Sequence, residues 1–176
     1  DFPLKKIIFM VIFLTLMLPV EVRIVPTFQV VASLGLLNSL SGLTLPLIAS
    51  ATATFLFRQF FLTIPKELLE AARLDGAGPL RFFYDIVMPL SKTNIAALFI
   101  IMFIYGWNQY LWPLVVTTSS DMSSIVMGIQ QLSSLADEIP QWNLIMAVSL
   151  CAMLPPLLII IFMQRLFEKG LFEMEK

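Results

Sequence analysis

Uncharged stretches divide the chain into parts that are separated by short charged segments. The stretches cover residues 7–20, 24–57, 93–120 and 139–164. A helix needs about 20 apolar residues to cross the hydrocarbon core of a bilayer. The third and fourth stretches contain apolar segments, at 94–116 and 143–163, that meet this length. We therefore expect both of them to span a membrane.

The second stretch, 24–57, is too long for one span, and a group of polar and small residues at 38–42 divides it. This division predicts a segment along the membrane surface at 25–40 and a span at 43–61. Together with a short span in the first stretch, the pattern predicts an all-α integral membrane protein with four spans.

Charged residues place these spans in the bilayer. We expect the Lys5 and Lys6 side chains to extend to one interface, with Glu21 and Arg23 at the other. If the N-terminus, the 58–92 loop and the C-terminal tail share one side, all of the eleven Lys and Arg residues except Arg23 lie there. Cytoplasmic loops carry the excess of Lys and Arg in membrane proteins. The 58–92 loop is therefore predicted to be cytoplasmic and the 117–142 loop, which has acidic but no basic residues, external.

The composition fits a lipid solvent and excludes several kinds of chemistry. Hydrophobic residues make up 59% of the chain and charged residues 13%, against about 25% charged in a typical soluble domain. With no His and one Cys, the chain offers no zinc site, no internal disulfide and no Ser-His or Cys-His pair. Its net charge of −1 gives no reason to expect nucleic acid as a partner. We therefore expect no metal and no catalytic residues, in a single domain of 176 residues.

The loop between the second and third predicted spans has the pattern of two short helices, over about residues 63–90. In the segment TIPKELLEAARLD, Pro65 suits a first helical turn and good helix formers follow it. Gly76 offers a left-handed stop, and Pro79 begins a second helix that Pro89 is expected to end. Each helix has an apolar stripe. Such a pair could lie on lipid or fit a groove on a soluble partner.

The spacing in this loop resembles the EAA loop of binding-protein-dependent ABC importer permeases. That pattern is Glu-Ala-Ala, three residues, Gly, nine residues, Ile, any residue, Leu, Pro. Its matching positions here are Glu70, Ala71, Ala72, Gly76, Ile86 and Pro89. Met88 replaces the leucine and keeps its volume and apolar character. The place of the pattern, between two spans on the positive side, agrees with the family.

The resemblance implies a transport subunit without enzyme activity or cofactor, in the bacterial cytoplasmic membrane. Residues 63–90 would be the coupling loop, whose first helix sits in a cleft of a separate ATPase, where Glu70 would pair with a basic residue. Gly76 would allow the turn, and Ile86 and Pro89 would set the second helix against the spans. The implied partners are an ATP-binding cassette ATPase dimer that binds ATP, a homologous second permease subunit and a periplasmic or extracellular solute-binding protein.

A second segment, YGWNQYLWP at 105–113, resembles the Trp-Asn-x-(Tyr/Phe)-x-x-Pro signature of carbohydrate-type permeases. More widely, essentially the whole chain is similar to one branch, the second membrane subunits of sn-glycerol-3-phosphate importers. The resemblance implies an ABC importer type I transmembrane domain that moves sn-glycerol-3-phosphate, or a related sugar or glycerophosphodiester, by alternating access. Because members of this branch have six spans, residues 1–176 would be a single domain that lacks the first two.

Polar residues at membrane depth usually face a cavity or a neighbouring helix. Trp107, Asn108 and Gln109, about 20–25 Å along the third span, are the candidates for the translocation path. Asn108 could equally bond to an adjacent helix, and Tyr110 and Trp112 are typical of anchors at the outer interface. Threonines at such depth usually bond to their own helix. The remaining polar candidates are Thr52, Thr54, Tyr105 and Ser149.

None of the predicted spans contains a basic residue in its interior. A phosphate-bearing solute would need such a residue along its path, so we expect the external binding protein or the partner permease subunit to recognise the phosphate. A permease for a sugar or oligosaccharide is the alternative. A channel outside the ABC class and a membrane enzyme are more distant alternatives, because a channel has no use for the EAA spacing and an enzyme needs a polar cluster that a chain without His does not offer.

Overall fold

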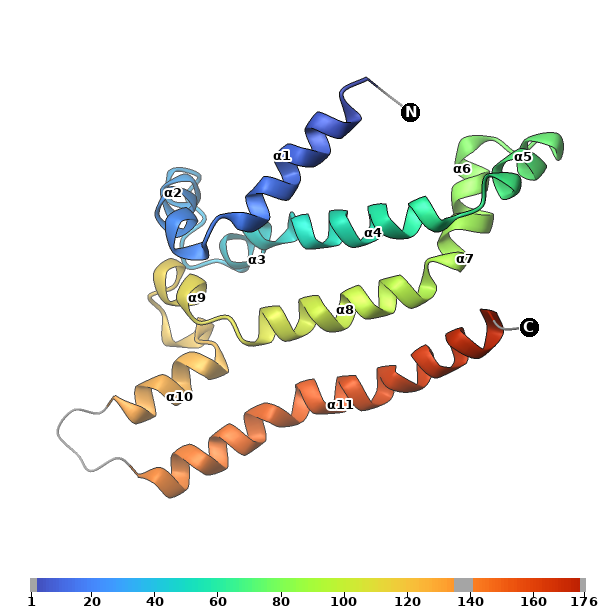
Figure 1. Ribbon diagram of the computed structural model, residues 1–176. Helices are drawn as coiled ribbons and strands as arrows, with labels where there is room; N and C mark the ends of the chain where they lie inside the picture. The colour runs from blue at the N-terminus through green and yellow to red at the C-terminus, as the bar shows by residue number, and fades with distance from the viewer. Residues whose placement is uncertain (1–2, 135–140, 175–176) are drawn as a thin grey trace.

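The computed structural model describes residues 3–134 and 141–174, and all regular structure in this part of the chain is helical. Four helices, which we call the long helices, run along the molecule, and the other helices gather at its two ends (Figure 1). The long helices are α1 (Lys5–Met17), α4 (Ala51–Thr63), α8 (Lys92–Trp107) and α11 (Trp142–Met174). One end, which we call the loop end, comprises α5 (Lys66–Leu74), α6 (Pro79–Phe82), the π-helical turn η1 (Phe83–Val87) and α7 (Met88–Leu90). The far end comprises α2 (Val20–Ser33), α3 (Leu40–Ile48), α9 (Leu111–Val116) and α10 (Ile125–Ser133), with the 3-10 turn η2 (Ser120–Met122) before α10.

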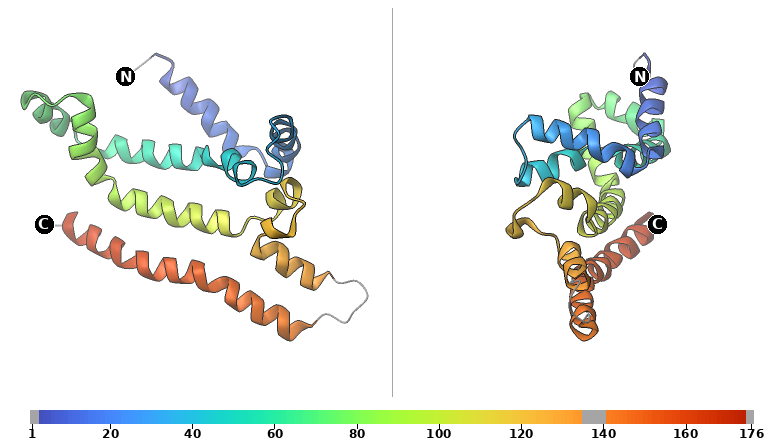
Figure 2. Two further views of the ribbon diagram at one scale, coloured as in Figure 1. Left: turned by 180° about the vertical axis from the view of Figure 1, so that it is seen from behind. Right: turned by 90° about the vertical axis from the view of Figure 1, so that its left-hand side faces the viewer.

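Both the start of α1 and the end of α11 lie at the loop end (Figure 2). The distribution of basic residues predicts this arrangement, in which the N-terminus, the 58–92 loop and the C-terminus share one side. Two acidic residues of the predicted external loop, Asp137 and Glu138, lie outside the described residues.

Two segments are long and apolar enough to cross a bilayer as they stand, Leu40–Thr63 and Trp142–Gln164. They contain the predicted spans at 43–61 and 143–163. Two further segments qualify only as bent pairs, which are α1 with α2, bent by 105°, and the 79–90 segment with α8, bent by 68°. The described residues thus hold from two to four spans.

The prediction of one continuous span at 94–116 is wrong. α8 ends at Trp107, about 24 Å after it begins, and α9 is a separate helix. A helix that ran through this region would place the Gln109 carbonyl against Pro113, which has no N–H to offer and would clash with it. The Gln109 carbonyl instead accepts a hydrogen bond from the Ser124 hydroxyl, at 3.0 Å.

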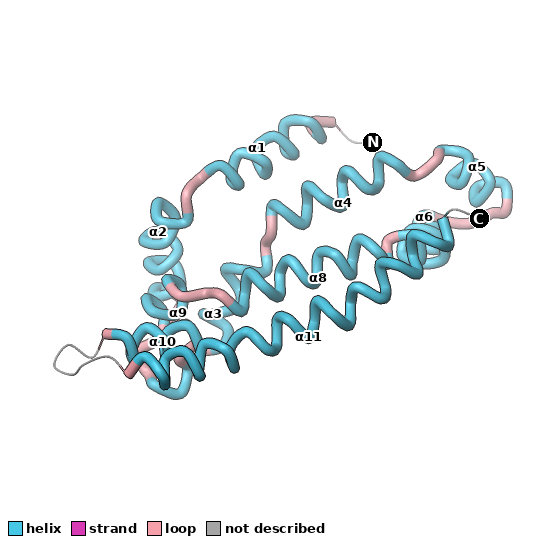
Figure 3. Tube along the Cα trace, turned by 60° about the horizontal axis from the view of Figure 1, so that its bottom comes forward, coloured by secondary structure: helices cyan, strands magenta, loops and turns pink. Residues whose placement is uncertain are grey.

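The first predicted span also ends early. α1 stops at Met17, and α2 leaves it at 105° after Pro19 (Figure 3). Pro19 disfavours a helical conformation of Leu18, which is extended with φ −77° and ψ 121°. The segment that was predicted to lie along the surface at 25–40 therefore begins as a helix at Val20. Further loop breaks separate α3 from α4 and α8 from α9.

The buried core lies at the far end, where α2, α3 and α9 meet. Val31, Trp112 and Val116 form it. The Trp112 indole N–H donates to the Leu43 carbonyl at 3.2 Å, so the polar atom of this large side chain is satisfied. The prediction that Trp112 is an anchor at the outer interface is wrong, because α9 turns the side chain inward and leaves it 5% exposed. Half-buried side chains around the core are Ile24, Phe28, Leu36, Leu43 and Leu47.

Specific side chains join the long helices in pairs. Phe55 of α4 stacks on Phe9 of α1, with ring centroids 6.3 Å apart. The Arg58 guanidinium lies 4.0 Å from the centre of the same Phe9 ring, a cation-π contact. Trp107 at the end of α8 donates its indole N–H to the Ala152 carbonyl of α11, at 3.0 Å. These contacts hold α1 against α4 and α8 against α11.

Candidate functional site

The 63–90 segment forms the pair of helical units that the sequence predicts. Gly76 follows α5 with a φ of 73°, a left-handed conformation that favours glycine. Its N–H donates to the Arg73 carbonyl at 3.0 Å, and the Ala77 N–H donates to the Ala72 carbonyl at 2.8 Å. These two bonds make a Schellman turn, which satisfies the last carbonyls of the helix. The predicted left-handed stop is confirmed.

The prediction that Pro89 ends the second helix is wrong, because the helical segment runs from Pro79 to Leu90. The π-helical turn η1 widens it, and the Met88 N–H donates to the Phe83 carbonyl there. The widened turn places Pro89 at the start of the next α-helical turn, where the missing N–H of proline costs no hydrogen bond.

Ser91 is the joint between this unit and α8. Its hydroxyl donates to the Val87 carbonyl at 2.6 Å, and its backbone N–H donates to the same oxygen at 2.9 Å. Ser91 and Val87 are both buried, and Ile86 is half-buried. The end of the second helix is thus fixed at the point where the chain bends by 68° into α8. Sequence reasoning missed Ser91, although a serine that bonds back along a helix is a known cause of bending.

The residues of the Glu-Ala-Ala group differ in exposure. Ala72 is 5% exposed, whereas Glu70 and Ala71 lie on the surface. Glu70 makes no hydrogen bond or ion pair with any side chain that the structure describes. Pro89 is exposed as well. The carboxylate of Glu70 is therefore available to a partner, while the alanine beside it packs inward.

Large apolar side chains are also exposed at the loop end. Leu74, Leu80 and Tyr84 are 89%, 75% and 65% exposed. Leu74 lies four residues after Glu70 on α5, so both side chains are on one face of that helix. The loop end therefore presents a charged group together with apolar surface.

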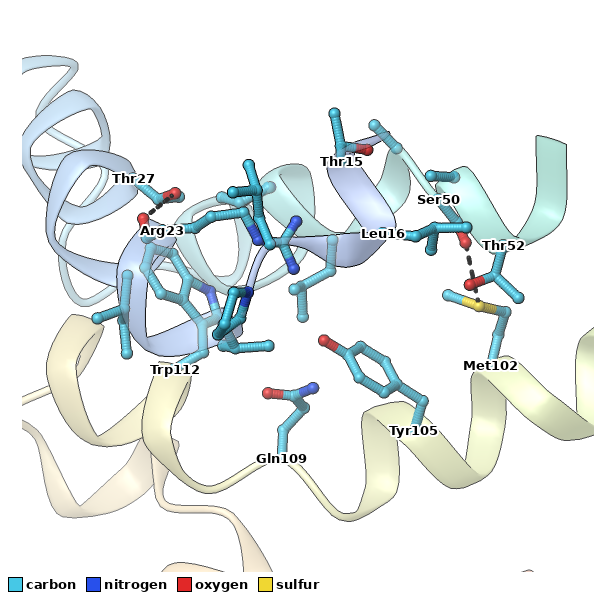
Figure 4. Close-up of a pocket in the computed structure, with 18 of the residues that line it drawn as sticks. Thr15, Leu16, Arg23, Thr27, Ser50, Thr52, Met102, Tyr105, Gln109 and Trp112 are labelled. Carbon is cyan, nitrogen blue, oxygen red and sulfur yellow. Dashed lines mark hydrogen bonds between the residues drawn. The ribbon is translucent and has the colours of Figure 1, made fainter. Parts of the chain in front are cut away.

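A cavity of about 450 Å³ lies at the other end of the long helices. It is an open cavity, lined by the α1–α2 break, the α3–α4 break and the end of α8 (Figure 4). Its volume is in the range of small-molecule sites. Among the described residues, Arg23 is the one that brings a charge to its lining. The lining residues with hydroxyl or carboxamide groups are Thr15, Thr27, Ser50, Thr52, Tyr105 and Gln109.

Sequence reasoning missed Arg23 as a cavity residue. The 105° bend between α1 and α2 brings the first turn of α2 back over the ends of the other helices. The Arg23 guanidinium consequently points toward Tyr105 and Gln109 (Figure 4). No predicted span has a basic residue in its interior, but the structure places Arg23, near the start of α2, in the lining of this cavity. The signal in the sequence is Pro19, which marks the break that a count of charges inside apolar stretches overlooks.

The structure separates the three predicted path residues. Only Gln109 lines the cavity, together with Tyr105. Trp107 is bonded to the Ala152 carbonyl of α11, and Asn108 donates its side-chain amide to the Ile104 carbonyl of its own helix at 2.9 Å. Trp107 and Asn108 therefore hold the end of α8 in place, which fixes the position of Gln109.

Of the remaining polar candidates, some line the cavity and others do not. Thr54 bonds to the Ser50 carbonyl of its own helix at 3.1 Å, as predicted, whereas Thr52 lines the cavity. Ser149 is half-buried on α11. Among the side chains that the structure describes, which end at Gln164, no group of His, Cys, Asp and Glu could hold a metal ion.

Comparison with known proteins finds a family and relatives that match this chain. Residues 1–173 match the family described as binding-protein-dependent transport system inner membrane components. Over 175 residues, the chain is 61% identical to the sn-glycerol-3-phosphate transport system permease protein UgpE of Pectobacterium atrosepticum, 61% to that of Yersinia pestis and 60% to that of Rhizobium meliloti. The chain is covered to 99% in each case and spans 62% of the length of these relatives.

A solved structure shares the fold. It is described as the crystal structure of a bacterial ABC transporter involved in the import of the acidic polysaccharide alginate. The similarity has a TM-score of 0.80 at 20% identity and covers 95% of this chain and 63% of that chain. The predicted all-α architecture of an ABC importer transmembrane domain is thereby confirmed. Because the family match extends over almost all of its residues, this chain belongs to the family of binding-protein-dependent transport system inner membrane components.

Proposed function

We propose that the full-length protein is a permease subunit of an ATP-binding-cassette importer in the bacterial cytoplasmic membrane. Its partners are an ATPase dimer, a homologous second permease subunit and a solute-binding protein on the external side. ATP is bound and hydrolysed by the ATPase, so this chain supplies neither a catalytic residue nor a cofactor site. Membership of the family supports this assignment.

The observation that carries the proposal is the form of the loop end. The Schellman turn at Gly76 holds α5 as a separate arm outside the predicted spans. On this arm, Glu70 and Leu74 share an exposed face. Covering an apolar side chain as exposed as Leu74 with a protein partner lowers the free energy, because it removes apolar surface from water. A groove with apolar walls and a basic residue, on the ATPase, is the complement of this face.

The contacts along the chain support rigid transmission of movement. When ATP closes the two ATPase subunits, α5 and the segment from Pro79 to Leu90 move with them. The buried joint at Ser91 passes this displacement to α8. α8 carries Tyr105 near its other end, about 20–25 Å away, and Gln109 follows directly after the helix. Movement at the loop end thus changes the walls of the cavity, as alternating access requires.

The solute that we propose is sn-glycerol-3-phosphate or a related glycerophosphodiester or sugar. Relatives at 60–61% identity are named as sn-glycerol-3-phosphate permeases. The cavity of about 450 Å³, with hydroxyl and carboxamide groups in its lining, suits a small polar molecule.

The proposal is tested with the full-length complex in proteoliposomes that contain ATP. We expect ATP-dependent uptake of radiolabelled sn-glycerol-3-phosphate when the solute-binding protein is supplied. Glu70→Lys reverses the charge on the exposed face and should abolish this uptake while membrane insertion is retained. Asp121→Lys makes the same kind of change on an exposed residue at the far end and serves as the control. Full uptake by the Glu70→Lys variant would contradict the docking role.

A further inference from the structure

Arg23 faces the cavity with a charge that no described residue neutralises. No acidic residue lines the cavity, and the Arg23 guanidinium makes no ion pair or hydrogen bond within the described part of the chain. The helix dipoles give the electrostatic field in the cavity no definite sign. The positive ends of α2 and α4 lie at the cavity, and so do the negative ends of α1 and α3. The guanidinium, which is permanently charged, therefore makes this cavity electropositive.

The backbone on both sides of the cavity is held in place. The Thr27 hydroxyl donates to the Arg23 carbonyl at 2.8 Å within the first turns of α2. On the opposite wall, the Gln109 N–H donates to the Gly106 carbonyl at 3.3 Å, and the Gln109 carbonyl accepts from Ser124. The Arg23 and Gln109 side chains therefore extend from backbone segments that hydrogen bonds hold in place.

Three hydrogen-bonding side chains converge on one space. The Tyr105 hydroxyl and the Gln109 carboxamide point toward the Arg23 guanidinium (Figure 4). None of the three side chains bonds to another residue in the described ranges. A guanidinium attracts an oxyanion through its charge and donates hydrogen bonds to it, and a hydroxyl and an amide add further donors. A phosphate group, with several acceptor oxygens on one atom, matches this set of donors.

On the basis of the function proposed above, we propose that Arg23, Tyr105 and Gln109 bind the phosphate group of the solute while it crosses the membrane. The ligand is a phosphomonoester or phosphodiester of a small polyol. Arg23 is exposed to the open cavity, so water and salt screen the interaction and keep it weak. A weak site is suited to transport, because the solute must also leave it. The alternative source of the same phosphate chemistry is a lipid headgroup.

The test measures how many solute molecules the full-length complex imports for each ATP that it hydrolyses. The external binding protein sets the solute concentration needed for uptake, so this ratio reports events inside the permease. We expect Arg23→Gln to lower the ratio for sn-glycerol-3-phosphate about tenfold, because a hydrogen-bonded charge pair is lost. Arg23→Lys keeps the charge and should recover most of the ratio. Glu21→Gln, in the same turn of α2 but outside the cavity lining, should leave it unchanged.

The outcomes separate this inference from the proposed function. If the wild-type complex imports the phosphate solute and Arg23→Gln imports it with an unchanged ratio, the inference is overturned and the proposed function stands. If the wild-type complex imports only uncharged sugars, the inference is overturned and the permease function stands, whereas ATP-driven import of no solute at all would overturn both. A reduction that Arg23→Lys does not relieve would also overturn the inference, because it would reflect the shape of the side chain and not its charge.

A comparison of vesicles identifies the source of the phosphate. The variants are measured in phosphatidylcholine vesicles, in which the choline cation neutralises the phosphate of each headgroup, and in vesicles that contain the anionic phosphatidylglycerol. Binding of the solute predicts the same reduction for Arg23→Gln in both. A reduction that depends on the lipid would show that Arg23 binds headgroups, and would overturn the proposal.

Discussion

The two ends of the molecule are built in different ways. At the loop end, the hydrogen bonds that define the structure join residues close in sequence, as in the Schellman turn at Gly76 and the Ser91–Val87 pair. At the far end, they join remote segments. Trp112 bonds to the carbonyl of Leu43, 69 residues away, and the Thr118 N–H donates to the Asn38 side chain, 80 residues away.

This difference suits two tasks. The loop end keeps its shape without help from the rest of the chain, so it can be displaced as a unit. The far end is held together by contacts between α2, α3 and α9, so it forms a stable wall for the cavity. Substitutions at the far end should therefore reduce the stability of the whole protein, whereas substitutions at the loop end should affect coupling to the ATPase.

The largest effect is expected for Trp112→Ala. The substitution removes a buried indole from the core of the far end and should lower the free energy of unfolding by about 3–5 kcal/mol. Trp142→Ala removes a side chain that is 60% exposed and is the matched control. Thermal unfolding of the solubilised full-length protein measures both. Equal midpoints for the two variants would mean that the far end lacks the core described above.

Gly42→Ala should have the next largest effect. A Cβ at Gly42 would overlap the Leu36 carbonyl oxygen, which is backbone and cannot move aside easily. We expect the free energy of unfolding to fall by about 3 kcal/mol, which is the upper end of the range for overpacked sites. Gly128→Ala in α10 meets no atom within 4 Å and should not destabilise the protein. The same unfolding experiment compares the two, and a stable Gly42→Ala variant would show that the loop before α3 is loosely held.

At the loop end, Gly76→Ala should have a smaller and more local effect. The left-handed backbone conformation at position 76 costs alanine about 1–2 kcal/mol. The turn that orients α5 for docking would therefore be less stable. We expect weaker association with the ATPase, by about tenfold, with an unchanged thermal midpoint. Gly78 has a φ of −72° and free space around it, so Gly78→Ala is the control. A lowered midpoint for Gly76→Ala would contradict the independence of the loop end.

Trp107→Phe should have the smallest effect. It keeps the aromatic ring that stacks on Phe103 and removes only the hydrogen bond to the Ala152 carbonyl. We expect a loss of about 1 kcal/mol in stability. A reduction of uptake greater than the loss of folded protein would indicate that Trp107 also contacts the solute.

The same contrast explains what the sequence could predict. The stop at Gly76 and the helix start at Pro79 follow from local preferences and were predictable from single residues. The positions of Arg23 and Trp112 depend on where α2 and α9 pack after the chain breaks, which local preference does not determine. Pro89 shows an intermediate case, because a widened turn removed the conflict that proline usually causes.

The central claim is that an ATPase holds the loop end, and cysteine cross-linking tests it directly. In a Cys151→Ser background, Glu70→Cys is introduced on α5 and Trp142→Cys at the start of α11, at the far end. In membranes that contain the full complex, we predict that position 70 cross-links to the ATPase and that position 142 does not. Labelling of position 70 by a reagent that cannot cross the membrane from the external side, without any cross-link to the ATPase, would contradict the account.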